Sequence, residues 1–188
     1  MSVAQYPAAM VLLTYNQAEY VRAAFESVVG QEGGPYEIIV SDDGSTDGTA
    51  EILRQLARAY SGPHRLLLLD SAVNRGLAGN INVSLASTTA PWIIMAAGDD
   101  ISKPGRARAI LEAVSGHPDF SAVCSGFEII DASGAWLGTF IDTDAAGKSA
   151  KFGDIAQGLA AQNAGRGYHI LTGATAAIAT FTAPAVSA

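Results

Sequence analysis

The stretch EIIVSDDGSTDGT, residues 37–49, predicts a strand, an acidic turn and a helix in immediate succession. Its apolar run at residues 38–40 is β-branched throughout, which is typical of a strand buried on both faces of a parallel sheet. Ser45 or Thr46 is a candidate N-cap for the helix, because a side-chain hydroxyl can accept a hydrogen bond from the first free backbone amides. The stretch therefore predicts one β–α unit of an α/β protein.

Two carboxylates stand in the turn of this unit, at Asp42 and Asp43. In open α/β sheets, ligands bind just beyond the carboxyl ends of the strands, which is where both residues are expected. The competing interpretation is a solvated turn that only caps the helix, since Asp and Gly are common turn residues.

Outside this unit, strand-like and helix-like segments alternate over the first two thirds of the chain. Strands are expected at residues 8–15, 65–69, 92–96, 120–130, 136–141 and 172–181. Apolar stripes with helical spacing are expected to face the sheet at Val21, Ala24, Phe25 and Val28, at Thr49, Leu53, Leu56, Ala57 and Tyr60, at Leu77, Ile81 and Leu85, and at Ala107, Ile110, Leu111 and Val114. Asn16 and Glu19 predict a capping box for the first helix, residues 142–151 a loop, and residues 155–162 a further helix. The pattern predicts a mostly parallel central sheet with helices on both faces and a C-terminal antiparallel hairpin.

The composition is that of one globular domain, with 188 residues of which 49% are apolar and 15% are charged. The net charge of -7 argues against a nucleic acid as partner, since proteins that bind phosphate backbones carry a basic face. The single cysteine, Cys124, cannot form an internal disulfide, which favours a reducing cytoplasm. The sequence shows neither an apolar run of membrane-spanning length nor a basic segment of the kind that opens a signal peptide.

A second acidic turn, at Asp99 and Asp100, follows the strand expected at residues 92–96. Because the carboxyl ends of parallel strands meet at one edge of a sheet, the two acidic turns are expected to converge. One pair is suited to a hard divalent cation that shares its oxygen ligands with a diphosphate. The other is suited to accepting hydrogen bonds from a base or a sugar. The alternative is that either pair caps a helix or binds only water.

Two other nucleotide-binding motifs are not matched. Residues 146–149 end like a phosphate-binding loop, but Asp142 stands where that motif needs glycine. A dinucleotide-binding fingerprint needs glycines after the first strand, where residues 14–17 read TYNQ. The histidines have no metal-ligand spacing, so loop or core positions are expected for His64, His117 and His169.

Four motifs occur in an order that resembles family 2 glycosyltransferases of the GT-A fold. They are TYN at residues 14–16, VSDDGSTDGT at residues 40–49, Asn74-x-Gly76 and GDD at residues 98–100. The resemblance spans residues 8–140. It implies a Rossmann-like GT-A sandwich, a nucleoside-diphosphate sugar as donor, Mg²⁺ or Mn²⁺ as cofactor, and inversion at the anomeric carbon.

The resemblance also implies roles for individual residues at the nucleoside end of the donor site. The residues expected to line this pocket are Thr14, Tyr15, Asn16, Asp42, Asp43, Asn74 and Gly76. Among them, Asp43 would accept the N–H of the base, which in this family is usually uracil.

At the diphosphate end, Asp99 matches the metal-ligating position of the family, and Asp100 would lie beside the sugar. The metal would neutralise charge as the nucleoside diphosphate leaves. The chain departs from the common Asp-x-Asp-Asp pattern, because Ala97 stands at its first position. The carboxylate that would contact the ribose is therefore missing.

The general base that the family uses to activate the acceptor is not assigned. The family places this carboxylate after a strand that resembles residues 173–178, whereas no acidic side chain follows Asp154 in this chain. We expect residues 1–115 to form a nucleotide-sugar-binding half, residues 116–188 to form part of an acceptor-binding half, and the base to lie beyond Ala188, as in a truncated chain.

The expected function is transfer of a sugar from a UDP-sugar to a saccharide or lipid-linked acceptor during synthesis of a cell-surface polysaccharide. The expected location is the cytoplasm, including the inner face of the membrane, and the prediction allows peripheral membrane association and a homodimer. Trp136 either packs in the fold or faces an acceptor sugar. The alternative function is a catalytically inactive or truncated nucleotide-sugar-binding module that acts through binding or through a partner chain.

Overall fold

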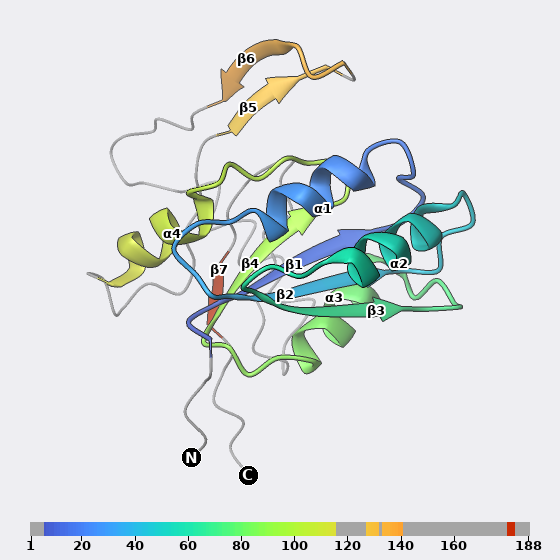
Figure 1. Ribbon diagram of the computed structural model, residues 1–188, viewed down its shortest axis with the longest axis horizontal. Helices are drawn as coiled ribbons and strands as arrows, with labels where there is room; N and C mark the ends of the chain where they lie inside the picture. The colour runs from blue at the N-terminus through green and yellow to red at the C-terminus, as the bar shows by residue number, and fades with distance from the viewer. Residues whose placement is uncertain (1–5, 116–126, 132, 141–179, 183–188) are drawn as a thin grey trace, which may run out of the picture.

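The computed structural model describes residues 6–115, 127–131, 133–140 and 180–182. Strands and helices alternate through the first of these ranges, as the sequence predicts (Figure 1). The elements are β1 (Ala9–Thr14), α1 (Val21–Val29), β2 (Glu37–Asp42), α2 (Thr49–Ala59), β3 (Arg65–Asp70), α3 (Gly76–Ala86), β4 (Trp92–Ala97), α4 (Arg106–Ser115), β5 (Phe127–Ile130), β6 (Trp136–Phe140) and β7 (Thr180–Thr182).

The central sheet has the strand order β3-β2-β1-β4-β7. The first four strands are parallel, with Val11 of β1 paired to Ile39 of β2 and to Met95 of β4. Only β7 is antiparallel to its neighbour, with Phe181 paired to Ile93. This confirms the predicted mostly parallel sheet and places β1, β2 and β4 side by side.

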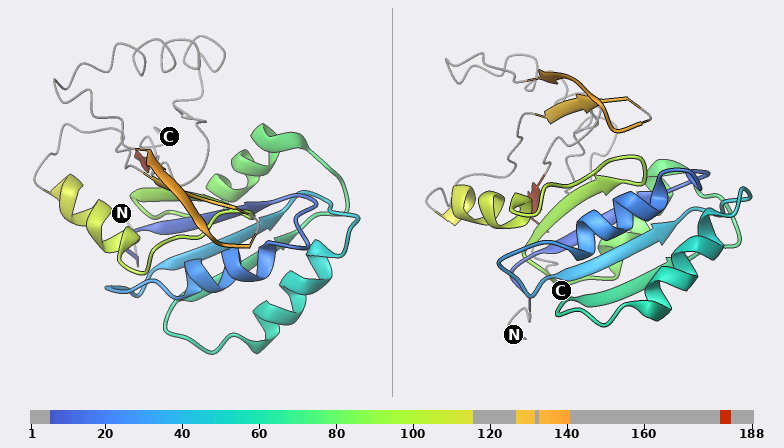
Figure 2. Two further views of the ribbon diagram at one scale, coloured as in Figure 1. Left: turned by 90° about the horizontal axis from the view of Figure 1, so that it is seen from above. Right: turned by 45° about the horizontal axis from the view of Figure 1, so that its top comes forward.

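Helices cover both faces of the sheet, as predicted (Figure 2). Buried residues of α1, α2 and α4 pack on one face, and Leu85 of α3 packs on the other. The placement of α3 follows from topology, because the chain reverses direction across the sheet between β3 and β4, and right-handed crossovers in opposite directions lie on opposite faces. The reversal leaves a topological switch point between β1 and β4, where α/β sheets open a crevice at the carboxyl edge.

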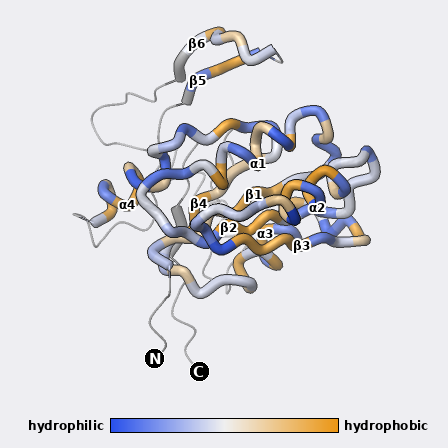
Figure 3. Tube along the Cα trace, viewed as in Figure 1, coloured by the Kyte–Doolittle hydropathy of each residue, from blue (hydrophilic) through white to orange (hydrophobic). Residues whose placement is uncertain are grey.

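The core is apolar and lies on both sides of β1 and β2 (Figure 3). Met10 and Leu12 of β1 face the α1 side, and Val11 faces the α3 side; all three are completely buried. Each such side chain contributes about 1.5–3 kcal/mol by leaving water. The predicted stripe on α1 is confirmed, since Val21, Ala24, Phe25 and Val28 are all buried.

The predicted face of α3 is partly wrong, because Leu77 is 57% exposed. The buried face contains Asn80, Ile81 and Ser84 instead. Asn80 Nδ2 donates to the backbone oxygen of Ser41 at 3.0 Å, and the Ser41 hydroxyl donates to Asn80 Oδ1. The hydrogen-bonded pair of Asn80 and Ser41 thus lies on the face of α3 where the helical periodicity predicts apolar contacts.

The predicted helix caps are also wrong. α2 begins after Gly48 and α1 after Tyr20, and neither helix has a side-chain cap. Ser45, a predicted cap, instead donates to Asp42 and accepts from the backbone amide of Asn16. The Ser45 side chain therefore joins its own turn to the backbone of the turn after β1.

The predicted C-terminal hairpin is confirmed, with β5 antiparallel to β6. Its Trp136 is 63% exposed and does not pack in the core. Lys103 Nζ, in the loop before α4, lies 2.6 Å from Glu128 Oε1 of β5. The loop and helix predicted at residues 142–151 and 155–162, and most of the strand at 172–181, lie outside the described residues. Within the described part of the chain, none of the helices has the length and apolar character needed to cross a membrane.

Candidate functional site

The candidate site lies at the carboxyl edge of the parallel sheet. β1 ends at Thr14, β2 ends at Asp42, and the second acidic turn follows Ala97 at the end of β4. The structure therefore brings the turns after three adjacent strands to one edge of the sheet, and the two acidic turns are among them, as the sequence predicted.

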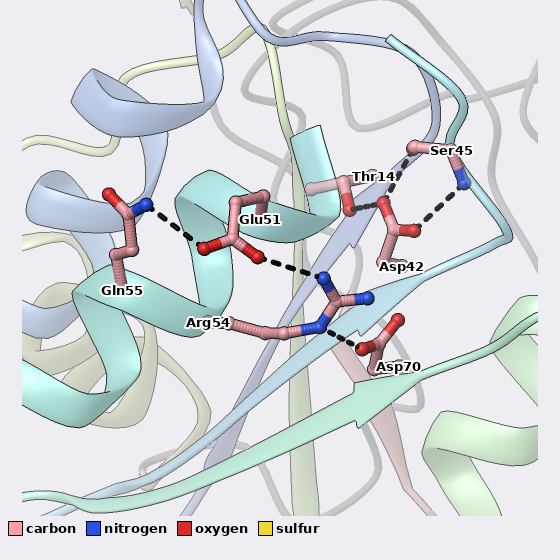
Figure 4. Close-up of polar contacts among 7 residues, drawn as sticks. All are labelled: Thr14, Asp42, Ser45, Glu51, Arg54, Gln55 and Asp70. Atoms are coloured by element: carbon pink, nitrogen blue, oxygen red, sulfur yellow. Dashed lines mark hydrogen bonds and ion pairs between the residues drawn. The ribbon is translucent and has the colours of Figure 1, made fainter. Parts of the chain in front are cut away.

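Asp42 is buried and fully engaged inside the protein (Figure 4). Its Oδ1 accepts from the hydroxyl of Thr14 at 2.9 Å and from the hydroxyl of Ser45 at 2.6 Å. Its Oδ2 accepts from the backbone amide of Ser45 at 2.9 Å. Both oxygens are thus used to hold the turns after β1 and β2 together, so that Asp42 shapes the predicted pocket.

Asp43, the next residue, is arranged differently. Its backbone amide donates to the oxygen of Thr14 at 3.0 Å, and its Oδ1 accepts from the backbone amide of Arg75 at 2.8 Å. The residue is only 3% exposed. The other carboxylate oxygen of Asp43 receives no hydrogen bond from the described residues, so it can still accept one.

The loop at residues 74–76 lies directly against the first acidic turn. A Cβ built on Gly44 would lie 2.9 Å from the backbone nitrogen of Asn74, so only glycine permits this approach. Gly44 also has φ 76°, a left-handed conformation. The side chain of Asn74 accepts from the amide of Gly76 at 2.8 Å, which shapes the start of α3.

Hydrogen bonds join the turn after β1 to the turn after β2. Asn16 has φ 51°, and its Oδ1 accepts from the backbone amide of Thr46 at 2.8 Å. Its own amide donates to the hydroxyl of Ser45 at 2.9 Å. The Tyr15 side chain is 46% exposed, and Asn16 is exposed as well, whereas Thr14 is buried.

Asp47 is a residue of this turn system to which sequence reasoning assigned no role. It accepts from the amide of Ala18 at 3.0 Å and from both the amide and the hydroxyl of Thr49, at 3.0 and 2.6 Å. Burial raises the pKa of Asp47, but the hydrogen bonds from Thr49 and Ala18 outweigh burial and hold the pKa below its ordinary value. The position of Asp47 two residues before the helix, where an Asx turn forms, was the available signal.

The second acidic turn packs against the turn after β1. A Cβ built on Gly98 would lie 2.8 Å from Thr14 Cγ2 and would collide with Gln17 Oε1. The glycine therefore lets the turn after β4 approach the same threonine that bonds to Asp42. Asp99 is exposed and Asp100 is half-buried at this turn.

Two carboxylates of this edge, those of Glu19 and Asp99, act on Tyr20. The carboxylate of Glu19 most strongly raises the pKa of Tyr20, and the carboxylate of Asp99 raises it further. Among the residues that the structure describes, no group of three or more His, Cys, Asp or Glu side chains could hold a metal ion. The exposed carboxylate of Asp99 nevertheless fits a divalent ion that takes most of its ligands from a diphosphate and water, as Mg²⁺ usually does.

A separate open cavity of about 510 Å³ lies between α2 and β3. Its lining includes Arg58, Leu66 and Leu68 but none of the residues of the two acidic turns. Arg54 on its wall is already paired to Glu51 and Asp70 (Figure 4). Because the residues of the two acidic turns do not line this cavity, we place the candidate site at the carboxyl edge of the sheet.

Curated relatives include EpsE of Bacillus subtilis, whose name assigns it to the glycosyltransferases, with 31% identity over 66% of this chain and 44% of EpsE. The succinoglycan biosynthesis protein ExoO of Rhizobium meliloti is 36% identical over 54% of this chain and 28% of ExoO. The chain thus matches less than half the length of either relative.

Among solved structures, the mannosyltransferase PcManGT of Pyrobaculum calidifontis, in complex with GDP-Man and Mn²⁺, aligns with a TM-score of 0.56 and 24% identity. The alignment covers 67% of this chain and 36% of PcManGT, and it supports the GT-A fold. The sequence profile of glycosyl transferase family 2 matches residues 10–173, which include both acidic turns. With that match spanning most of its length, the chain belongs to glycosyl transferase family 2.

Proposed function

We propose that this chain carries the donor site of a glycosyltransferase that transfers a sugar from a UDP-sugar, with Mg²⁺ or Mn²⁺, to a saccharide or lipid-linked acceptor. The observation that carries the proposal is the Asp43 oxygen that no described residue bonds, on a turn that contacts Thr14, the residue against which the turn bearing Asp99 packs. The name of ExoO supports a role in cell-surface polysaccharide synthesis. The proposed location is the cytoplasm or the inner face of the membrane.

The geometry of Asp43 supports uracil as the base. One carboxylate oxygen is already bonded to the amide of Arg75, which leaves one oxygen for the ligand. Uracil presents a single ring N–H between two carbonyls and matches one acceptor. Guanine presents adjacent N1–H and N2–H donors, which are best met by two carboxylate oxygens.

At the other end of the donor, Asp99 would hold the metal ion and Asp100 would lie beside the sugar. The ion, when bound, supplies the positive charge that stabilises the departing diphosphate. Asp42, Ser45 and Asn16 keep the edge of the site in one conformation, which reduces the entropy lost on binding. PcManGT, which shares the fold, was solved with Mn²⁺.

The proposed transfer inverts the anomeric carbon by direct displacement, with residues 1–115 forming the donor half and residues 116–188 contributing to the acceptor half. Direct displacement needs a base that takes the proton of the acceptor hydroxyl. None of the described residues is assigned that role here.

A second candidate is a nucleotide-sugar-binding module without transferase activity of its own. The observation that favours it is Ala97 at the position where the family has a carboxylate. Both candidates share the donor site but differ in turnover.

Calorimetric titration with UDP and GDP, each with and without Mn²⁺, tests the shared site. We expect UDP to bind more tightly than GDP and Mn²⁺ to tighten both; UDP binding that ignores Mn²⁺ would contradict the metal assignment. Release of UDP from a panel of UDP-sugars with saccharide acceptors then separates the candidates. Turnover supports the enzyme, whereas tight binding without any UDP release supports the module.

A further inference from the structure

Arg106, the first residue of α4, is a buried cation directly behind the second acidic turn. The residue as a whole is only 7% exposed. Nη1 donates to the hydroxyl of Ser102 at 2.7 Å, and Nη2 donates to the backbone oxygen of Met95 at 2.6 Å. The guanidinium therefore bridges two points that flank the acidic turn, one on β4 and one just after the turn.

The bridged segment, residues 95–102, contains the proposed metal ligand Asp99. Its far end is held a second time, because the amide of Ser102 donates to the hydroxyl of Ser27 at 3.0 Å. The carboxylate of Asp100 also stabilises the charged form of Arg106. We propose, on the basis of the donor site proposed above, that Arg106 is a positioning residue that holds the Asp99–Asp100 turn in the conformation that receives the metal–diphosphate.

Holding a loop with a buried arginine costs free energy, because the charged group loses its hydration. Burial lowers the pKa of Arg106 to about 10, and the residue still carries its charge at neutral pH. A well-packed apolar side chain of similar volume is often as stable as a buried charge or more so. The planar fork of a guanidinium, however, reaches the Met95 carbonyl and the Ser102 hydroxyl at once, which a point-like ammonium does less well.

Contacts other than those of Arg106 also attach the start of α4. Gln31 accepts from the amide of Ala107 at 2.9 Å and donates to the backbone oxygen of Lys103 at 2.8 Å. The amide of Glu32 donates to the oxygen of Pro104 at 2.8 Å. The start of α4 is thus anchored to the segment after α1, whereas the contacts of Arg106 reach Met95 and Ser102, which lie before the helix.

The test compares Arg106→Gln and Arg106→Lys with Arg108→Gln, a matched control on the same helix whose guanidinium is exposed and pairs only weakly with Glu112 at 3.8 Å. The dissociation constant of Mn²⁺ is measured in saturating UDP, and that of UDP is measured in EDTA. We expect Arg106→Gln to weaken Mn²⁺ binding by about tenfold or more, as loss of groups that orient metal ligands does. The dissociation constant of UDP in EDTA should stay within about twofold of the wild-type value, because Asp43 lies at the end of a different strand. Arg106→Lys should restore part of the Mn²⁺ affinity, and the control should match the wild type.

Ser102→Ala provides a milder variant if Arg106→Gln does not fold, since it removes one of the two bridging contacts. It should weaken Mn²⁺ binding less than Arg106→Gln and leave metal-free UDP binding unchanged. Unchanged Mn²⁺ affinity in a folded variant, or an equal loss of Mn²⁺ and UDP affinity, overturns the positioning role. Failure of the wild type itself to bind Mn²⁺ with UDP would instead refute the metal site of the proposed function.

Discussion

At the residue scale, Asp42 and Asp43 are neighbours in sequence with different tasks. Both oxygens of Asp42 accept hydrogen bonds, from Thr14 and Ser45, whereas one oxygen of Asp43 accepts none from the described residues. The two carboxylates are chemically identical, but that of Asp42 bonds to Thr14 and Ser45, whereas that of Asp43 bonds to the amide of Arg75. Mutating each one should therefore affect a different property of the protein.

Asp43→Asn should weaken UDP binding with little effect on folding. The amide oxygen of Asn can still accept from the Arg75 amide, but the other acceptor becomes an N–H donor that repels the N–H of uracil. A lost hydrogen bond to a charged group costs about 1.5–3 kcal/mol, so UDP affinity should fall by at least about tenfold in calorimetry.

The matched control is Asp70→Asn, which changes an aspartate at the end of β3 that pairs with Arg54. It should bind UDP like the wild type. Equal affinities for Asp43→Asn and the wild type would remove Asp43 from the nucleoside pocket.

Asp42→Ala should destabilise the fold. The substitution removes three hydrogen bonds and leaves the buried hydroxyl of Thr14 only its longer contact, 3.4 Å, with the backbone oxygen of Ser41, so we expect a loss of about 2–4 kcal/mol in the free energy of unfolding. Urea denaturation measures it, with Asp70→Ala as a surface comparison that should cost about 1 kcal/mol or less. A similar small loss in both variants would show that the Asp42 contacts contribute little.

At the element scale, polar side chains at the carboxyl edge form hydrogen bonds between turns and do not cap the helices that follow. Asn16, Ser45 and Asp47 bond across turns, so α1 and α2 start without side-chain caps. Local rules cannot anticipate this exchange, because a hydroxyl near a helix start satisfies the capping pattern whether or not a closer acceptor exists in another turn.

His64 joins elements at the opposite edge of the sheet. Its Nδ1 accepts from the backbone amide of Tyr36 at 3.1 Å, so its Nε2 carries the proton shared with the oxygen of Gln31 at 3.0 Å. The ring also stacks on Tyr36, with centroids 5.5 Å apart. Burial lowers the pKa of His64, while the bond to Gln31 partly opposes that shift. A second proton, on Nδ1, would face the Tyr36 amide.

We therefore expect His64 to make stability depend on pH. Its folded pKa lies below the unfolded value of about 6.5, so its contribution is complete above that value and is lost as pH falls through the folded pKa. Urea denaturation at about pH 7 and pH 5 measures the loss. His64→Asn keeps an acceptor for the Tyr36 amide without titrating, and its stability should fall less over this range. An equal fall in both proteins would assign the pH dependence to other groups.

At the scale of the whole molecule, the strand order brings distant segments into one site. Thr14 touches both acidic turns, since it bonds to Asp42 and lies against Gly98, 84 positions further along the chain by residue number. The parallel pairing of β1 with both β2 and β4 is what allows this. A ligand that spans both turns should therefore stabilise the entire sheet.

Thermal unfolding should show this coupling. UDP with Mn²⁺ should raise Tm more than UDP alone, because a ligand that binds only the folded state stabilises it by about 2.7 kcal/mol at a hundred times its Kd. EDTA should abolish the additional rise, and so should Asp99→Ala, whereas Glu26→Ala on the exposed side of α1 should leave it intact. An additional rise that persists in Asp99→Ala would exclude Asp99 as the metal ligand.

Much of the fold was predictable because β-branched and apolar runs such as residues 38–40 reflect local physics. A strand buried on both faces needs such residues wherever it lies, and the stripe on α1 records which face meets the sheet. The meeting of Asp42 and Asp43 with the turn at Asp99 was predictable too, because strand polarity places all carboxyl ends at one edge.

The sequence alone established the α/β alternation, the parallel sheet and the edge that carries the acidic turns. Only the tertiary structure decided that Asp42 is enclosed while Asp43 keeps an oxygen that no described residue bonds, that Asn80 replaces an apolar contact, and that Arg106 bridges the second acidic turn. The physical reason is that hydrogen bonds between distant segments depend on where each donor and acceptor lies in space. Apolar periodicity records burial, but it contains no information about which polar groups will meet.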